Sequence, residues 1–215
     1  MSEPILQGVY GPYTIDARDR REVLGYRLAL LLAAIAQTAL LVQWRLVGPQ
    51  GLWPWLALLA LALGLALRWI HIYLRPLHRA LQLLWLLGCL GAAVMAWRVG
   101  PDQMVVALGD QRLWLLAIGP LFAALAGIGF KEFFCFRRVE AIGVTLLLPL
   151  ALLGYLVGVL DAGTSSGLMA IQSALLLLLC GRKFPMPAAA DVGDKSVFAH
   201  LATLDQGQQP REQRS

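Results

Sequence analysis

The sequence predicts an all-α, polytopic membrane protein built as a bundle of about six transmembrane helices. Of its 215 residues, 59% are hydrophobic and 14% are charged, and the mean hydropathy is +0.67. A soluble domain carries roughly 25% charged residues, so this chain has too few charges to cover a surface that faces water. Lipid must therefore be the solvent for most of the chain.

The positions of Lys and Arg predict the number of spans and their orientation. When the loops between apolar runs are assigned to alternate sides, fifteen of the eighteen Lys and Arg residues fall on one side, and only Arg45, Arg98 and Arg112 fall on the other. Cytoplasmic loops of membrane proteins are enriched in Lys and Arg. We therefore expect six spans with both termini in the cytoplasm. This placement also explains the net charge of +5, so no nucleic-acid partner is predicted.

Residues 1–23 are predicted to form a small cytoplasmic unit ahead of the first span. β-prone residues on either side of Gly11-Pro12 predict a hairpin over Ile5–Ile15. Asp16 is suited to cap the helix that follows, because its carboxylate can accept hydrogen bonds from the free N–H groups of the first turn. We expect this helix to enter the membrane near Tyr26.

Six apolar runs follow, and residues 24–183 are predicted to form one transmembrane domain because no long polar linker divides them. Gly88 and Gly91 give the third run a small-residue face that allows close contact with another helix. The runs are Leu28–Gln43, Leu52–Ile70, Ala80–Trp97, Leu113–Phe130, Ala141–Leu160, and Gly167–Gly181, the last extended back to Thr164.

Residues 184–215 are predicted to form a polar, partly disordered cytoplasmic tail that is loose from Phe184 onward. Lys195–Leu204 has the composition of a surface helix, and Gln206–Ser215 that of a disordered segment.

The most unusual stretch is Lys131–Glu140, where half of the residues are charged although long apolar runs lie on both sides. If the stretch is helical, Glu132, Phe136 and Glu140 share one face. One interpretation is an interfacial turn held by aromatic anchors and ion pairs. Another is a surface that binds lipid headgroups or a partner protein, made by Lys131, Phe133, Phe134, Phe136, Arg137 and Arg138.

A third interpretation of the same stretch is a reactive site, with Glu132 and Cys135 as candidate catalytic residues. Glu132 would act as an acid or base and Cys135 as a nucleophile or redox group, although no His lies nearby in sequence to activate the thiol. Cys89, Cys135 and Cys180 include no CxxC pair, and an odd number of thiols cannot all form internal disulfides. We therefore expect reduced cysteines.

His71 and His78 are the candidate cofactor-binding residues. They lie seven residues apart, and their imidazoles could ligate the metal of a haem or a chlorophyll. Pro76 interrupts the helix that would align them, and the alternative interpretation is two polar residues at the membrane interface. The chain has no HExxH and no carboxylate cluster within a span, so no metal site and no cofactor are predicted.

Charged side chains are nearly absent from the apolar runs, which argues against an ion-coupled transporter but not against a passive pore. The main polar residues inside the runs are Gln37, Gln82, Thr145 and Gln172.

The most specific motif is Lys131-Glu132-Phe133-Phe134-Cys135-Phe136, which is followed by Glu140-Ala141. A second motif, Tyr10–Ile15, lies far upstream. In these motifs the chain resembles a family of uncharacterised integral membrane proteins found chiefly in cyanobacteria. The resemblance covers about residues 8–183. It implies a multi-pass protein of a bacterial plasma or thylakoid membrane, and it supplies no activity and no catalytic residues.

Three functions are compatible with these observations. The first is a non-enzymatic scaffold or assembly protein, which presents a basic and aromatic cytoplasmic face to a membrane protein complex or to anionic lipid. The second is a small membrane enzyme or a redox or pigment-binding protein that uses Glu132 and Cys135 or His71 and His78. The third is a passive transporter.

Overall fold

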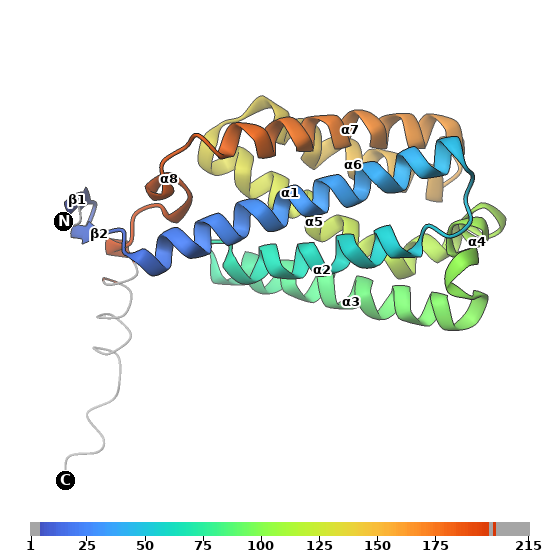
Figure 1. Ribbon diagram of the computed structural model, residues 1–215, viewed down its shortest axis with the longest axis horizontal. Helices are drawn as coiled ribbons and strands as arrows, with labels where there is room; N and C mark the ends of the chain where they lie inside the picture. The colour runs from blue at the N-terminus through green and yellow to red at the C-terminus, as the bar shows by residue number, and fades with distance from the viewer. Residues whose placement is uncertain (1–4, 198–199, 201–215) are drawn as a thin grey trace, which may run out of the picture.

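The computed structural model describes residues 5–197 and residue 200, and within them the protein is a bundle of antiparallel helices with a small β-hairpin at one end (Figure 1). The elements are β1 (Ile5–Gly8), β2 (Gly11–Thr14), α1 (Ala17–Leu46), α2 (Trp53–Trp69), α3 (Arg75–Val99), η1 (Pro101–Gln103), α4 (Met104–Asp110), η2 (Arg112–Trp114), α5 (Leu115–Phe136), α6 (Val139–Leu156), α7 (Ala162–Lys183) and α8 (Ala188–Val192).

Five of these helices are long and apolar enough to cross a membrane: α1, α3, α5 with the turn before it, α6 and α7. The sixth, α2, is also apolar but has 17 residues, or about 26 Å at 1.5 Å per residue, against a hydrocarbon core of about 30 Å. The predicted all-α polytopic fold is therefore confirmed. The six predicted spans correspond to five long helices and one shorter one.

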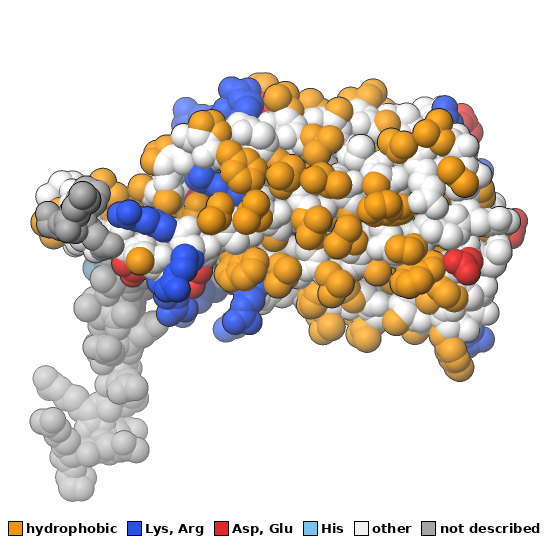
Figure 2. Space-filling model, in the orientation of Figure 1, with side chains coloured by type: hydrophobic (Ala, Val, Ile, Leu, Met, Phe, Trp, Pro, Cys, Tyr) orange, Lys and Arg blue, Asp and Glu red, His pale blue; other side chains and the backbone are white. Residues whose placement is uncertain are grey.

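Successive long helices alternate in direction, so the connections gather at two opposite ends of the bundle (Figure 1). The hairpin, the α2–α3 junction, the α5–α6 junction and α8 lie at one end, here called the cap end. The α1–α2 turn, α4 and the α6–α7 junction lie at the other, the far end. Lys and Arg gather at the cap end, while hydrophobic side chains cover the long sides (Figure 2). This arrangement agrees with the alternation that the Lys and Arg pattern predicts.

Small residues hold α3 against α5, as expected from Gly88 and Gly91. A Cβ added at Gly88 would lie 2.3 Å from the backbone nitrogen of Leu121, and one added at Gly91 would lie 1.9 Å from the carbonyl oxygen of Ala117. Both distances are far inside van der Waals contact, so the two backbones approach this closely only because Gly occupies both positions.

The predicted hairpin and helix cap are both present at the start of the chain. β1 and β2 pair antiparallel, with Ile5 opposite Thr14. The Asp16 carboxylate accepts hydrogen bonds from the backbone N–H groups of Arg18 and Asp19, and the Asp19 side chain accepts one from the N–H of Asp16. This reciprocal capping starts α1 at Ala17, well before its apolar part.

Residues 184–197, here called the strap, are packed against the cap end, which differs from the loose tail expected from Phe184 onward. Val192 is buried with Ile15 and Val23 in a small apolar cluster. The Asp194 carboxylate accepts a hydrogen bond of 2.7 Å from the N–H of Val9, and the Ser196 hydroxyl accepts one from the N–H of Tyr10. Most of the predicted helix Lys195–Leu204, and all of Gln206–Ser215, lie outside the described residues.

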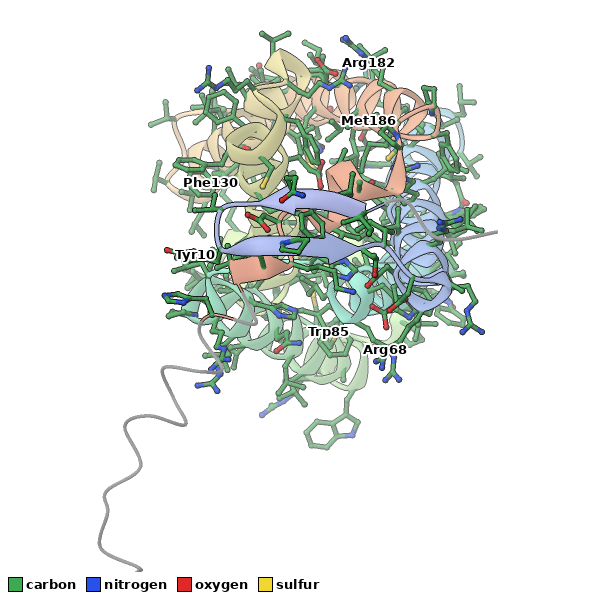
Figure 3. The ribbon with its side chains drawn as sticks, turned by 90° about the vertical axis from the view of Figure 1, so that its left-hand side faces the viewer. Tyr10, Arg68, Trp85, Phe130, Arg182 and Met186 are labelled. Atoms are coloured by element: carbon green, nitrogen blue, oxygen red, sulfur yellow. The ribbon has the colours of Figure 1, made fainter. Side chains whose placement is uncertain are left out.

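Figure 3 looks onto the cap end and shows the two strands of the hairpin lying across it, with α8 beside them. The hairpin and the strap together, here called the cap, therefore cover the ends of the helices. The polar residues at those ends meet underneath.

Candidate functional site

A cluster of charged side chains and one tyrosine lies buried beneath the cap. Four elements contribute to it, and the chain brings them together because α1, α5 and α7 all reach the cap end, where α8 follows α7. Each member is at most 7% exposed. The members are Tyr26 and Arg27 of α1, Lys131 and Glu132 of α5, Lys183 of α7 and Asp191 of α8.

Glu132 is the centre of this buried ion cluster. Its side chain is fully buried. Oε1 accepts a hydrogen bond of 2.6 Å from the Tyr26 hydroxyl and one of 3.2 Å from Lys131 Nζ. Oε2 accepts one of 2.6 Å from Lys183 Nζ. Both carboxylate oxygens are therefore occupied by strong donors from three helices.

Asp191 connects the strap to the same cluster. Its Oδ1 accepts a hydrogen bond from Lys183 Nζ, and its Oδ2 lies 2.8 Å from Arg27 Nε and 2.6 Å from Arg27 Nη2. The Arg27 guanidinium also donates to the carbonyl oxygen of Met186, at 2.9 Å. One arginine of the first helix thus holds both a side chain and the backbone of the strap.

Two aromatic rings surround the buried ammonium groups. Lys183 Nζ lies 4.5 Å from the centre of the Phe136 ring and 5.2 Å from that of Tyr26. Lys131 Nζ lies 5.4 Å from each of the two rings. Such cation–π contacts favour a cation where water is excluded. Phe136 therefore points into the protein and supports the cluster.

The cluster contains three cations, Arg27, Lys131 and Lys183, and two carboxylates, Glu132 and Asp191. Moving this many charges out of water is costly, and the cost is recovered only where the geometry satisfies each group. Because Glu132 is fully buried and both of its oxygens accept hydrogen bonds, its carboxylate is closed to substrates in this conformation. The arrangement acts as a clamp that joins three spanning helices to the strap.

The structure separates the two candidate catalytic residues by environment. Cys135 is exposed, whereas Glu132 is fully buried and bonded to Tyr26 and two lysines. The Cys135 thiol is not among the groups that contact the Glu132 carboxylate. Among the described contacts, no hydrogen bond joins the acid to the thiol.

The residues expected on a lipid-binding or partner-binding surface also divide into two sets. Lys131 belongs to the buried ion cluster and is only 4% exposed, so it is not part of that surface, and Phe136 turns toward the same cluster. Phe134 is 74% exposed, and Arg137 is exposed as well. Phe133 and Arg138 are half-buried, and Arg138 Nη2 contacts the sulfur of Met186 at 3.3 Å.

Glu132, Phe136 and Glu140 do not share one helical face, because the helix that holds Glu132 and Phe136 ends before Glu140. Arg137 has φ 49° and ψ 36°, which is left-handed and breaks the helix after Phe136. Glu140 instead lies in the first turn of α6, where its carboxylate is 3.2 Å from Arg182 Nη1. The Lys131–Glu140 stretch is therefore a helix end, a tight reversal and a new helix start.

His71 and His78 make separate contacts at the α2–α3 junction. His71 Nε2 lies 3.4 Å from the Glu22 carboxylate. Burial lowers the pKa of His71, and the negative charge of Glu22 offsets part of this effect. His78 Nε2 lies 2.8 Å from the carbonyl oxygen of Leu67. Across the described residues, no group of three or more His, Cys, Asp or Glu side chains is arranged to hold a metal ion.

Sequence reasoning missed Arg27, Lys183 and Asp191 as members of a site. One signal was present: Arg27 lies directly after Tyr26 at the start of an apolar run, and a cation there requires a partner. The partner could not be identified, because Asp191 lies 164 residues further along the chain.

A second polar contact lies inside the bundle, between Gln37 of α1 and Gln172 of α7. The Gln37 amide nitrogen donates to the Gln172 carbonyl oxygen, and both side chains are almost completely buried. Both residues were expected within spans. Their pairing was not predicted.

The model of a family described as "Uncharacterized integral membrane protein (DUF2301)" matches residues 65–200, which include all helices from α3 to α8. This match confirms the expected resemblance to a family of integral membrane proteins. No curated protein and no solved structure matches the chain.

Proposed function

This chain belongs to the DUF2301 family of uncharacterized integral membrane proteins, and we propose that it is a non-enzymatic interaction platform. Its cap end would face the cytoplasm and hold the acidic surface of a membrane protein complex close to the bilayer. The excess of Lys and Arg at the cap end supports this orientation. The resemblance in sequence makes a bacterial plasma or thylakoid membrane the expected setting.

The observation that carries the proposal is the buried ion cluster. Its charged groups bond to one another and so connect α1, α5 and α7 to the strap. The strap in turn binds the hairpin through Asp194 and Ser196. A rigid end surface costs less entropy to bind than a flexible one, so a clamped cap is suited to recognition.

The surface around the cap is cationic. Arg68 and Arg182 lie on opposite sides of the cap end (Figure 3), and both are exposed. Further exposed arginines at this end are Arg20, Arg21, Arg75, Arg79 and Arg137. At the far end, Arg45, Arg98 and Arg112 are accompanied by Asp102, Asp110 and Asp161. Positive potential is therefore concentrated where a negatively charged partner would bind.

Exposed apolar residues beside these arginines suit the headgroup layer of the bilayer. Phe134 is 74% exposed and Val139 is 73% exposed, on either side of the reversal at Arg137. The ring of Phe130 lies 5.7 Å from that of Phe134. These side chains would fix the depth of the cap end at the membrane interface.

The geometry gives less support to chemistry at Glu132 and Cys135. The carboxylate is sealed beneath the cap, whereas the thiol is exposed. Catalysis would require the strap to leave and the clamp to open, while recognition requires the conformation that is present.

A charge-reversal experiment tests the platform. Arg68→Glu and Arg137→Glu together should remove partners that are cross-linked to the full-length protein in native membranes and identified by mass spectrometry. The matched control is Arg45→Glu with Arg98→Glu at the far end, where Arg45 and Arg98 occupy the last turns of their helices as Arg68 does.

The platform predicts that the control keeps the cross-linked subunits, and that Cys135→Ser keeps them too. Equal loss in both charge-reversal variants, or a protein that is never cross-linked to another subunit, would show that the proposal is wrong. A loss of cellular phenotype in Cys135→Ser with all cross-links intact would favour the enzymatic alternative.

A further inference from the structure

An apolar cavity lies inside the bundle toward the far end. Its volume is about 120 Å³, and it is lined by residues of α1, α4, α5, α6 and α7, with Trp44, Leu108, Phe122 and Met169 among them. An apolar cavity of roughly 150 Å³ stays dry in other proteins and binds small hydrocarbons such as benzene. This cavity is therefore large enough for the end of a hydrocarbon chain.

A groove of about 270 Å³ on the side of the bundle adjoins this cavity. It lies between α5 and α6 and reaches Leu84 of α3. Leu116 and Leu153 at its edge are 62% and 57% exposed, so it opens on the face that lies against lipid. Leu115, Phe122 and Leu152 line both the groove and the cavity. The two spaces are thus neighbours that share these side chains as a common wall.

The three hydroxyl groups that line the cavity are already bonded within the protein. The Ser165 hydroxyl donates to the carbonyl oxygen of Ala151 at 3.1 Å, and the Ser166 hydroxyl donates to that of Gly163 at 2.9 Å. The Tyr155 hydroxyl donates to the carbonyl oxygen of Leu108 at 3.2 Å. An occupant therefore gains little from polar atoms, which favours hydrocarbon.

One exposed cation lies next to the cavity wall. The Arg112 guanidinium carbon is 4.7 Å from the centre of the Tyr155 ring, and its Nη1 donates to the Tyr155 carbonyl oxygen at 3.2 Å. Tyr155 also lines the cavity. An anionic group held by Arg112 would thus sit at the interface, directly beside an apolar space that runs into the membrane.

We propose that this groove and cavity bind one acyl chain of an anionic phospholipid, with its phosphate at Arg112. The hydrocarbon would enter from the bilayer through the groove, and the Arg112 charge would favour an anionic headgroup over a zwitterionic one. This inference concerns the far end and is independent of the platform proposed for the cap end.

Two glycines allow the space to be filled without a clash. A Cβ added at Gly119, in the groove, or at Gly109, beside the cavity, would have no atom within 4 Å. Gly119→Leu and Gly109→Leu therefore place a larger side chain where its first carbon meets no other atom, and each is expected to occupy part of the site. Gly181→Leu is the matched control, because Gly181 is equally open but lies at the cap end of α7.

Binding is measured by native mass spectrometry of the delipidated full-length protein titrated with dioleoyl phosphatidylglycerol. We expect one lipid to stay bound to the wild type and to Gly181→Leu, and its occupancy to fall in Gly119→Leu and in Gly109→Leu. Unchanged occupancy in both filled variants would overturn the proposed site.

The headgroup assignment is tested with dioleoyl phosphatidylcholine. The wild type should bind phosphatidylglycerol about fivefold more tightly, which is the scale of one exposed ion pair. Arg112→Gln should abolish this preference, and Arg98→Gln should keep it. Equal binding of the two lipids by the wild type would overturn the role of Arg112.

Discussion

Lys183 joins two carboxylates that belong to different parts of the molecule, one in α5 and one in the strap. Its ammonium donates to Glu132 and to Asp191, and the Phe136 ring lies 4.5 Å away. A buried charge with this many partners is stable only while all of them remain, because each partner also depends on the others. Single substitutions in the buried ion cluster should therefore have large effects.

Replacing Glu132 should destabilise the protein strongly. Glu132→Leu leaves Lys131 buried without its carboxylate partner, and breaking a buried pair in this way costs about 3–5 kcal/mol. Thermal unfolding of the purified protein in detergent measures the loss. Glu22→Leu is the control, because Glu22 pairs with the exposed Arg18, and exposed ion pairs contribute little to stability. Adding Lys131→Met to Glu132→Leu should restore part of the lost stability. Equal losses of stability in Glu132→Leu and Glu22→Leu would contradict the clamp.

Asp194 should make the attachment of the hairpin sensitive to acid. The Ser196 hydroxyl and the N–H of Val9 donate to its carboxylate and lower its pKa. A group whose folded pKa is depressed stabilises the folded state above its unfolded pKa, and this contribution disappears as the pH falls through the folded pKa. Hydrogen exchange of residues 5–14, corrected for intrinsic rates, should therefore rise below about pH 4. Asp194→Asn should show fast hydrogen exchange of residues 5–14 at neutral pH and little further change in acid. If exchange in that variant still rose in acid, the Asp194 carboxylate would not be the source of the acid sensitivity.

Among the elements, the helices could be predicted because lipid imposes length and hydropathy on a span. The α5 boundary could not be predicted from its apolar run. The run ends at Phe130, yet the helix continues to Phe136, because Lys131 and Glu132 point into the protein and find partners there. The strap was missed for a similar reason: its local composition is polar, and its order comes from Arg27, Tyr73 and the hairpin.

The contact between α3 and α5 predicts a strong effect of substituting Gly91. In Gly91→Val, the new side chain would meet the carbonyl oxygen of Ala117, because even a Cβ would lie 1.9 Å from it. Overpacking of this kind costs about 1–3 kcal/mol, and the melting temperature in detergent should fall accordingly. Gly181→Val, which has open space around its Cβ, is the matched helical control. A melting temperature for Gly91→Val equal to that of the control would contradict the close packing.

For the molecule as a whole, alternation of the helices places both described ends of the chain at the cap end. The sequence could predict this alternation, because Lys and Arg at the ends of the runs report the sides of the membrane. It could not predict the buried ion cluster, because the pairing of Glu132 with Tyr26 and Lys183 joins residues separated by 106 and 51 positions. Only the folded bundle brings them within hydrogen-bonding distance.

Cys135 offers a direct test of the proposed orientation. It is the one exposed thiol, since Cys89 is half-buried inside α3 and Cys180 is buried. A membrane-impermeant maleimide should label Cys135 in inside-out vesicles and leave it unlabelled in intact cells. In a Cys135→Ser background, Asp102→Cys at the far end should give the opposite result. Labelling of Cys135 in intact cells would reverse the assigned orientation.

The bonds between hairpin and strap also have a consequence for the order in which the protein is made. Val9 leaves the ribosome long before Asp194, its partner 185 residues later. Tyr26 and Arg27 likewise gain their hydrogen-bond partners, Glu132 and Asp191, only after α5 and α8 have been synthesised. Closure of the cap is therefore a late event that requires synthesis and insertion as far as the strap. A chain interrupted before the strap would leave Arg27 at the membrane surface without the Asp191 carboxylate.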